Sequence, residues 1–290
     1  KWEEKNLALV TVAELTRAAA EGGYAVGAFN LNNMEILQAV IAAAEEERSP
    51  VILQASQGGL KYAGIDYIAA MARVAAENAS VPVALNLDHG TSFEQAMVCI
   101  RKGFSAVMID GSQLPFEENI ALVKRVADVA HAVGVSVEAE LGKIGGTEDD
   151  IVVAEQDATM TNPDEAAEFV ERAQPDLLAV AIGTAHGVYK GEPRIDFKRL
   201  EEIKKRVDIP LVLHGASGVP DEAIRKACQL GISKINIDTE LRVAFTQAVR
   251  NVLEAAPNEI DPRKILGPAR EAMQKVVQEK MRLFGSSGRA

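Results

Sequence analysis

Short apolar runs alternate with amphipathic stretches along the whole chain. Eight runs rich in β-branched residues are each too short for a typical helix, and most are followed by apolar residues at helical spacing. We therefore predict eight strand–helix units. The predicted strands cover residues 25–30, 51–56, 81–89, 105–111, 135–142, 177–184, 211–215 and 234–239.

The expected helices carry recognisable ends. Asn162 is a predicted N-cap, followed by Pro163 at the first helical position and by acidic residues. Residues 91–94, Thr-Ser-Phe-Glu, resemble a capping box before a helix that stops at Gly103. These ends make each helix a separate unit between two strands.

Strands that alternate with helices imply parallel pairing through right-handed crossovers. Eight such units fit a closed (β/α)8 TIM barrel, because closure leaves no edge strand. The main alternative is an open, doubly wound sheet. Since the chain has no Pro/Ser-rich linker, we predict a single α/β domain over residues 1–290, with a C-terminal helical extension from about Asp261 to Phe284.

Charge and cysteine content narrow the class of function. The formal net charge of −11 argues against a nucleic-acid or anionic-membrane partner, since either requires a basic face. No run approaches the roughly 20 apolar residues of a membrane span. Cys99 and Cys228 fit no zinc or redox spacing, so we expect reduced core thiols and a cytoplasmic protein.

Three of the four histidines end predicted strands, where parallel α/β folds bind their ligands. His89, His186 and His214 are each followed by glycine, which lets the chain turn sharply or approach a bound group. Three imidazoles with an open fourth position suit catalytic zinc. The alternative is three hydrogen-bonded core histidines.

Carboxylates gather at the same predicted rim. Asp88 precedes His89, and because neighbouring strand residues point to opposite faces, both can serve a site only where the strand bends. Glu138 and Glu140 point the same way, towards a metal or into a salt-bridged layer. Two further acids end predicted strands, Asp110 and Asp238.

Two glycine- and serine-containing segments suggest a phosphate subsite. Residues 213–218 follow the seventh predicted strand and residues 236–239 follow the eighth, where barrels often bind phosphate through backbone N–H groups. Lys190, Arg242 and Arg263 could add cationic contacts. The acidic, glycine-hinged segment from Gly145 to about Asp157 is either a mobile lid or a solvent loop.

The sequence resembles the class II, metal-dependent fructose-1,6-bisphosphate aldolases over nearly its whole length. The motifs that carry this likeness lie at residues 27–33, 87–90, 138–142, 183–190, 213–218, 236–239, 261–264 and 284–290. The resemblance implies a catalytic Zn²⁺, replaceable by Co²⁺ or another divalent ion, on His89, His186 and His214. It also implies that Glu140 lies near the metal and ligates it in some states.

The resemblance further implies three catalytic residues. Asp88 takes the proton from the C4 hydroxyl, Glu148 handles the proton at the dihydroxyacetone phosphate carbon, and Asn236 contacts the substrate. The substrate phosphates and a monovalent cation (Na⁺ or K⁺) are expected near matched positions. These are Asn30, Ser56, Gly187, Lys190, Gly215, Ser217, Asp238, Thr239, Arg242 and, from a neighbouring subunit, Arg263.

The chemistry agrees with the metal route. Retro-aldol cleavage needs a sink for charge beside the ketone, which a divalent ion supplies as a Lewis acid. The other route, a lysine Schiff base, is disfavoured, because residues 177–184 contain no lysine and Lys234 starts the last predicted strand at the wrong end.

We therefore predict reversible cleavage of fructose 1,6-bisphosphate to dihydroxyacetone phosphate and glyceraldehyde 3-phosphate, by a lyase of glycolysis and gluconeogenesis. Tagatose-1,6-bisphosphate aldolase is the alternative, against which Asp238 weighs. A metal-dependent phosphopentose epimerase and a non-catalytic sugar-phosphate binder remain less favoured. By resemblance we expect a homodimer or homotetramer.

Overall fold

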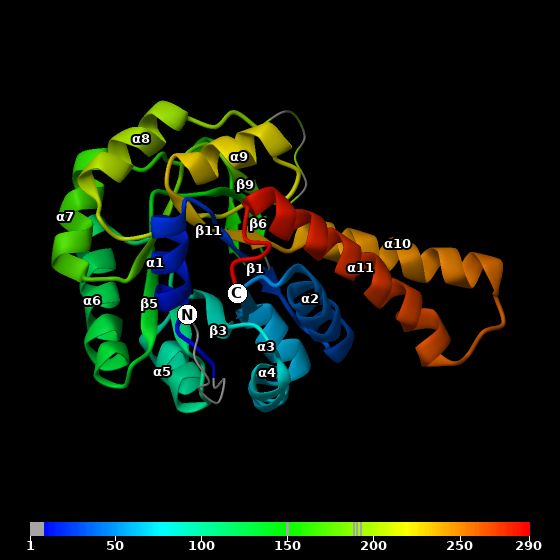
Figure 1. The fold of residues 1–290 in the computed structure, drawn as a ribbon. Helices are drawn as coiled ribbons and strands as arrows, with labels where there is room; N and C mark the ends of the chain where they lie inside the picture. The colour runs from blue at the N-terminus through cyan, green and yellow to red at the C-terminus, as the bar shows by residue number, and fades with distance from the viewer. Residues whose placement is uncertain (1–8, 149–150, 188, 190, 192) are drawn as a thin grey trace.

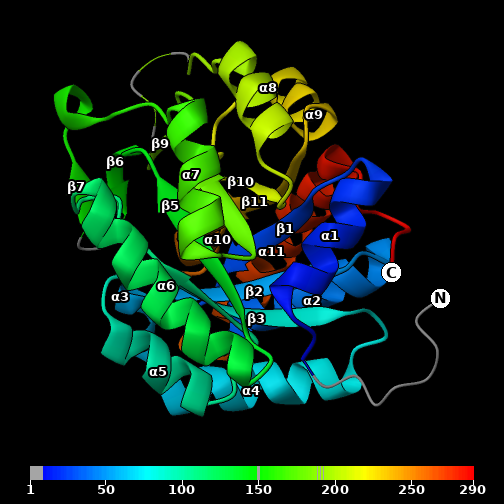
Figure 2. The same ribbon diagram turned by 90° about the vertical axis from the view of Figure 1, so that its left-hand side faces the viewer.

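A closed barrel of eight parallel strands forms the centre of the computed structural model, which describes residues 9–148, 151–187, 189, 191 and 193–290. The strands follow one another around the barrel in the order β1-β11-β10-β8-β5-β4-β3-β2. Figures 1 and 2 show the barrel with its surrounding helices in two views. The barrel is confirmed, and the open sheet is excluded. The strands are β1 (Val26–Asn30), β2 (Val51–Ser56), β3 (Val83–Gly90), β4 (Ala106–Ile109), β5 (Ser136–Leu141), β8 (Leu177–Val180), β10 (Leu211–Leu213) and β11 (Ile232–Ile237).

Helices surround this barrel. Asn162 caps its helix as expected, accepting hydrogen bonds from two backbone N–H groups, whereas the cap at residues 91–94 is Ser92 and not Thr91. The helices are α1 (Val12–Gly22), α2 (Met34–Glu47), α3 (Gln57–Ala63), α4 (Ile65–Asn78), α5 (Phe93–Arg101), α6 (Phe116–Ala132), α7 (Pro163–Ala173), α8 (Phe197–Arg206), α9 (Asp221–Gln229), α10 (Thr239–Ala255) and α11 (Pro262–Phe284), with a 3₁₀ turn at Glu155–Asp157.

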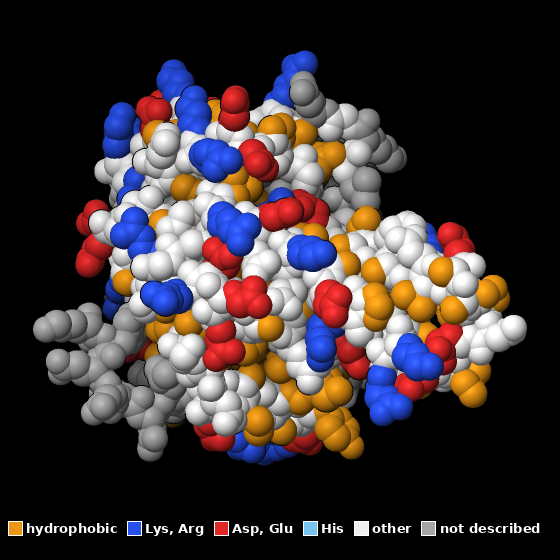
Figure 3. All heavy atoms as spheres, turned by 45° about the vertical axis from the view of Figure 1, so that its right-hand side comes forward, with side chains coloured by type: hydrophobic (Ala, Val, Ile, Leu, Met, Phe, Trp, Pro, Cys, Tyr) orange, Lys and Arg blue, Asp and Glu red, His pale blue; other side chains and the backbone are white. Residues whose placement is uncertain are grey.

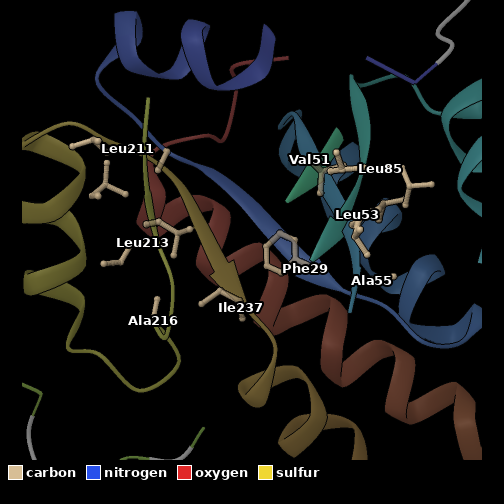
Figure 4. Close-up of a cluster of buried hydrophobic side chains, with 14 of the residues drawn as sticks. Phe29, Val51, Leu53, Ala55, Leu85, Leu211, Leu213, Ala216 and Ile237 are labelled. Atoms are coloured by element: carbon tan, nitrogen blue, oxygen red, sulfur yellow. The ribbon is translucent and has the colours of Figure 1, made fainter. Parts of the chain in front are cut away.

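Two apolar cores follow from the alternation of side chains along each strand. One lies between the strands and the outer helices, and Figure 4 shows part of it around Phe29, Leu53 and Leu213. The other lies inside one end of the barrel, where Leu15 of α1 packs against strand residues such as Ile52. Helix α1 therefore closes the end of the barrel opposite the carboxyl ends of the strands.

The last two helices project from the barrel as an arm (Figure 1). Helix α11 packs along both α10 and α2, which anchors the arm at its base. Its end also returns to the barrel, because the backbone carbonyl of Phe284 accepts a hydrogen bond from the N–H of Ala25. The predicted C-terminal extension is therefore helix α11, which begins on the projecting arm and ends in contact with the barrel.

A small second sheet stands beside the barrel. Strand β6 (Gly145–Glu148) pairs with β7 (Ile151–Val153) as an antiparallel hairpin and with β9 (Ala185–His186) in parallel. The sequence analysis predicted only a loop from Gly145 to Asp157. Because β-branched residues occur in both arms of the hairpin, much of this segment forms strands. Among the described helices, none has the length and apolar character needed to cross a membrane.

Candidate active site

A bulge near the end of β3 places Asp88 and His89 together. Between Leu87 and Gly90, β3 advances by three residues while its neighbour β4 advances by two. His89 sits within this bulge with a left-handed φ of 46°, a conformation that non-glycine residues rarely adopt. Both side chains are buried. The sequence analysis required a bend at this point, and the bulge provides it.

The three predicted histidines converge at the carboxyl end of the barrel. His89 lies on β3, His186 on β9, and His214 directly follows β10. Their ring centroids lie 4.8 to 5.8 Å apart in pairs. Nε2 of His89 lies 3.0 Å from Nδ1 of His214. One nitrogen from each ring lies within 4.8 Å of the other two, so all three could reach one ion through zinc–nitrogen bonds of about 2 Å.

Carboxylates hold the remaining nitrogens of two of these rings. Nδ1 of His89 lies 3.0 Å from Oδ2 of Asp110, and Nε2 of His214 lies 2.8 Å from Oε1 of Glu138. Such contacts fix the ring orientation and the tautomer of metal-binding histidines. The donor set therefore fits a divalent ion, with Nε2 of His89 and Nδ1 of His214 directed towards it.

The pKa shifts agree with this arrangement. Burial raises the pKa of Asp110, but its contacts with His89 and Ser112 outweigh burial and leave the pKa at about 2. Burial likewise raises the pKa of Glu138, and Lys234 and His214 outweigh it to give about 2. Burial lowers the pKa of His214 despite its bond to Glu138. Ionised acids beside a neutral imidazole are the form that a metal site needs.

Of the two glutamates on β5, Glu140 lies near Nδ1 of His214, the nitrogen that faces His89. Its Oε2 lies 3.8 Å from Nδ1 of His214, and it forms a second possible metal-binding group with His89 and Asp110. Glu138 instead pairs with His214 and Lys234. Glu138 therefore belongs to a salt-bridged layer, whereas Glu140 lies in a group of side chains that could bind a metal.

Two amides orient the carboxylate of Asp88. Nδ2 of Asn30 donates to Oδ2 at 2.7 Å, and Nδ2 of Asn236 donates to Oδ1 at 3.2 Å. Gln54 in turn donates to Oδ1 of Asn30 at 2.6 Å. The sequence analysis assigned no role to Gln54. Its inward position as a polar residue in an apolar strand was the signal that could have revealed it.

A pocket brings together seven of the predicted substrate-binding residues. It opens beside the N-terminus of α10, where backbone N–H groups favour an anion. Gly215 has a left-handed φ of 63°, and an added Cβ would lie 2.5 Å from the carbonyl oxygen of Ala185, so only glycine fits there. The seven are Asn30, Gly187, Gly215, Ser217, Asp238, Thr239 and Arg242.

The remaining predicted residues lie elsewhere. Ser56 ends β2, opposite Asp88 in register, and its hydroxyl caps α3. The side chain of Arg263 lies on the projecting arm, 88% exposed and paired with Asp261. Lys190 lies outside the described residues. Glu148 ends β6, where the structure describes its backbone only.

The small sheet includes one of the three clustered histidines, His186. Gly146 of β6 pairs with His186 of β9, and an added Cβ on Gly146 would lie 2.2 Å from the carbonyl oxygen of His186. The backbones of these two strands therefore approach each other closely. Because Glu148 is only two residues further along β6, the segment predicted as a lid is tied directly to the histidine cluster.

Histidines and acids at the carboxyl mouth of a parallel barrel define a metal-binding (β/α)8 enzyme. Residues 10–289 match the family model described as fructose-bisphosphate aldolase class-II. The chain therefore belongs to the class II fructose-bisphosphate aldolases, a metal-dependent family of lyases.

Similar proteins support this assignment over the full length. A fructose-bisphosphate aldolase of Thermus caldophilus is 52% identical, with 97% of this chain and 100% of that protein covered. A sulfofructosephosphate aldolase of Alkalicoccus urumqiensis is 46% identical, with 98% and 99% covered. The crystal structure of the YdjI aldolase from Escherichia coli K12 has a TM-score of 0.86 and 38% identity, with 97% and 99% covered.

Proposed function

We propose that the protein reversibly cleaves fructose 1,6-bisphosphate to dihydroxyacetone phosphate and glyceraldehyde 3-phosphate. The main observation behind this proposal is that Asn236 contacts both the proposed base, Asp88, and one histidine of the possible metal site, His214. A single amide, Nδ2 of Asn236, lies 3.2 Å from both Oδ1 of Asp88 and Nε2 of His214. A base fixed beside a Lewis-acid site is what retro-aldol cleavage requires.

His89, His186 and His214 would hold Zn²⁺, which Co²⁺ could replace, and Glu140 is close enough to join them. When bound, the ion supplies Lewis-acid stabilisation of the charge that develops beside the ketone. Nitrogen donors favour zinc over magnesium or calcium, which prefer oxygen.

Asp88 removes the proton from the C4 hydroxyl as the C3–C4 bond breaks. Hydrogen bonds from Asn30 and Asn236 fix the orientation of its carboxylate. Glu148 exchanges the proton at the carbon of dihydroxyacetone phosphate. A Glu148→Ala variant should then lose proton exchange on dihydroxyacetone phosphate, and normal exchange would remove Glu148 from this role.

The two phosphates bind at opposite ends of the site. Backbone N–H groups of the pocket around Gly215 and Ser217 take the first phosphate, together with Lys190, and a monovalent cation (Na⁺ or K⁺) binds next to it. This placement is supported by the N-terminus of α10 at the same pocket. Ser56 and a partner-derived Arg263 bind the far phosphate, together with Arg242, which also lines the pocket of the first phosphate.

The projecting arm supports a homodimer or homotetramer in which Arg263 completes a neighbouring site. Hydrophobic side chains gather on this arm (Figure 3). Among them, Val243 is 59% exposed and Ile260 88% exposed. Such a surface is typical of an interface between subunits. Arg263 lies at the start of α11, at the outer part of the arm (Figure 1).

Mixing two inactive variants tests the shared site. Asp88→Ala and Arg263→Ala chains, each impaired alone, should form mixed oligomers with one complete site, made of Asp88 from one subunit and Arg263 from the other. Activity should therefore reappear after dissociation and reassociation. Two copies of the same variant provide the control, and no recovery in a proven mixed oligomer would exclude the shared site.

A metal-dependent assay with three sugars tests the substrate. Fructose 1,6-bisphosphate, tagatose 1,6-bisphosphate and sulfofructose phosphate are compared after chelation and restoration of Zn²⁺ or Co²⁺. We expect the highest kcat/KM with fructose 1,6-bisphosphate. A higher value with tagatose 1,6-bisphosphate would establish the alternative, and release of no triose phosphate from any sugar would exclude aldol cleavage.

Reduced thiols support a reducing, cytoplasmic location. Cys99 and Cys228 are both free and buried, and burial raises the pKa of each thiol to about 12. Both thiols therefore stay protonated and unreactive at neutral pH.

A further inference from the structure

Lys234 is a lysine whose side chain lies fully inside the barrel. It is the third residue of β11, and none of its surface is exposed. The sequence analysis placed it at the start of the strand, far from the site, and this placement was wrong. An ammonium group is costly to bury unless it is paired, so its contacts are informative.

The ammonium group makes two contacts of equal length. Nζ lies 2.8 Å from Oε2 of Glu138 and donates to Oδ1 of Asn236, also at 2.8 Å. These two partners belong to different strands, β5 and β11. We propose that Lys234 is a positioning residue that orients the metal ligand His214 and the base Asp88 at the same time. The inference rests on the function proposed above for those two residues.

The first branch runs through Glu138 to the metal site. Both carboxylate oxygens of Glu138 are used: Oε2 faces Lys234, and Oε1 lies 2.8 Å from Nε2 of His214. Because the carboxylate is held at both ends, its rotation is restricted. The imidazole is thereby fixed with Nδ1 towards His89, which is the orientation that a shared ion requires.

The second branch runs through Asn236 to the base. An asparagine amide can be turned by 180° with little change in shape, which exchanges its donor and acceptor. Lys234 donates only, so its contact fixes the carbonyl Oδ1 towards the ammonium. Nδ2 must then face Asp88, to which it donates. Without Lys234, a turned amide would present its oxygen to the carboxylate of Asp88 and repel it.

Lys234 could instead be only half of a structural ion pair, and a comparison of variants separates the two roles. Glu138→Gln weakens the metal branch and keeps the contact of Lys234 with Asn236, although it also removes the carboxylate that pairs with the buried ammonium. The double variant Lys234→Met/Glu138→Gln disturbs both branches and leaves no uncompensated charge in the interior, which would itself be destabilising. Ile52→Val, inside the closed end of the barrel, controls for a general loss of stability.

Three measurements are made on the full-length protein. They are the affinity for Zn²⁺ by chelator competition, the visible absorption spectrum of the Co²⁺ form, and kcat and KM at saturating Zn²⁺. Both Glu138→Gln and the double variant should bind Zn²⁺ about 10- to 100-fold more weakly, with a changed Co²⁺ spectrum. Ile52→Val should match the wild type in all three.

The kcat measured at saturating Zn²⁺ then distinguishes the effect on metal binding from the effect on Asp88. We expect saturating Zn²⁺ to recover most of the kcat lost in Glu138→Gln, in which Lys234 can still donate to Asn236. In the double variant kcat should stay about 10- to 100-fold low with little change in KM, because Asp88 is misplaced. Lys234→Arg, which keeps a cationic donor, should recover part of this loss.

Equal kcat for Glu138→Gln and the double variant at saturating Zn²⁺ would overturn the proposal. So would a finding that no Lys234 variant folds in any metal state, since the residue would then be needed for the fold itself. Failure of the proposed function is a different result: the wild type would itself bind no zinc or release no triose phosphate.

Discussion

The two ends of the barrel interior use the same strands for opposite purposes. At the end closed by α1 the inward residues are apolar, and they include Ile52 and Val212. Two residues further along the chain from each of these, the inward positions are Gln54 on β2 and His214 just after β10, which are equally buried but polar. Successive inward-facing residues of one strand, two positions apart, thus belong to the packed core and to the candidate active site.

The two layers differ in how each side chain is stabilised. In the closed end, burial of apolar surface is sufficient. In the open end each polar group needs a specific partner, and Lys234, Glu138 and Asn236 supply partners for one another. We therefore expect changes in the closed end to alter stability, whereas changes in the open end alter metal binding and turnover. The following predictions test that division.

Removal of the metal should have the largest effect. Chelation should abolish cleavage, because the charge that forms beside the ketone would lose its Lewis-acid stabilisation. Restoring Zn²⁺ or Co²⁺ should recover the activity, and circular dichroism should show that the apoprotein keeps its fold, since the closed end holds the barrel together. Activity that persists at full level in chelator would contradict a metal mechanism.

Asp88→Ala should lower kcat by about 10²- to 10⁴-fold, because a positioned general base contributes this much. KM should change little, since the phosphates rather than the C4 hydroxyl anchor the substrate. Steady-state kinetics at saturating zinc provide the measurement. Ser233→Ala, on β11 and bonded to the carbonyl of Gly231, is the matched control. A kcat for Asp88→Ala close to that of this control would show that another group removes the proton.

The fold was predictable because its signals are local and repeated. All eight strands were found from apolar runs, and His89, His186 and His214 were found because they lie at or just beyond the carboxyl ends of three of the predicted strands. The small sheet was missed, since β6 and β9 pair across a separation that no local pattern reports. Strand β6 also begins with two glycines, Gly145 and Gly146, which weaken the sequence signal for a strand.

The contacts between side chains inside the barrel were less predictable from the sequence than the positions of those residues on the strands. The bulge at His89 was required by the placement of Asp88 beside it, and the structure confirms a bend. The contacts of Lys234 with Glu138 and Asn236 could not be foreseen, because they depend on strand register and on which strands face each other across the barrel. An error of two residues in the start of β11 was enough to hide them.

Leu15→Ala tests the closed end on its own. Leu15 is buried in the contact between α1 and the barrel interior. Its truncation should reduce the free energy of unfolding by about 2–5 kcal/mol, while kcat per folded molecule stays unchanged. Denaturant unfolding and kinetics on the same sample provide the two values. A large fall in kcat would show that packing at this end controls the site, and that the two layers are not separate.

The boundary between the layers can be tested on β2 by two substitutions two residues apart. Ile52→Val should lower the free energy of unfolding by about 0.5–1.5 kcal/mol with no change in kcat.

Gln54→Leu removes the donor to Oδ1 of Asn30 while keeping similar volume. It should change stability little, because the loss of the donor to Asn30 is offset by removal of Oε1 of Gln54, a buried oxygen with no hydrogen-bond partner among the described residues. Asn30 would then hold Asp88 less firmly, so kcat should fall by about 10-fold, less than for loss of Asp88 itself. If Gln54→Leu instead destabilises the protein and spares kcat, the functional layer begins two residues further along the strands, at the level of Ser56 and Asp88.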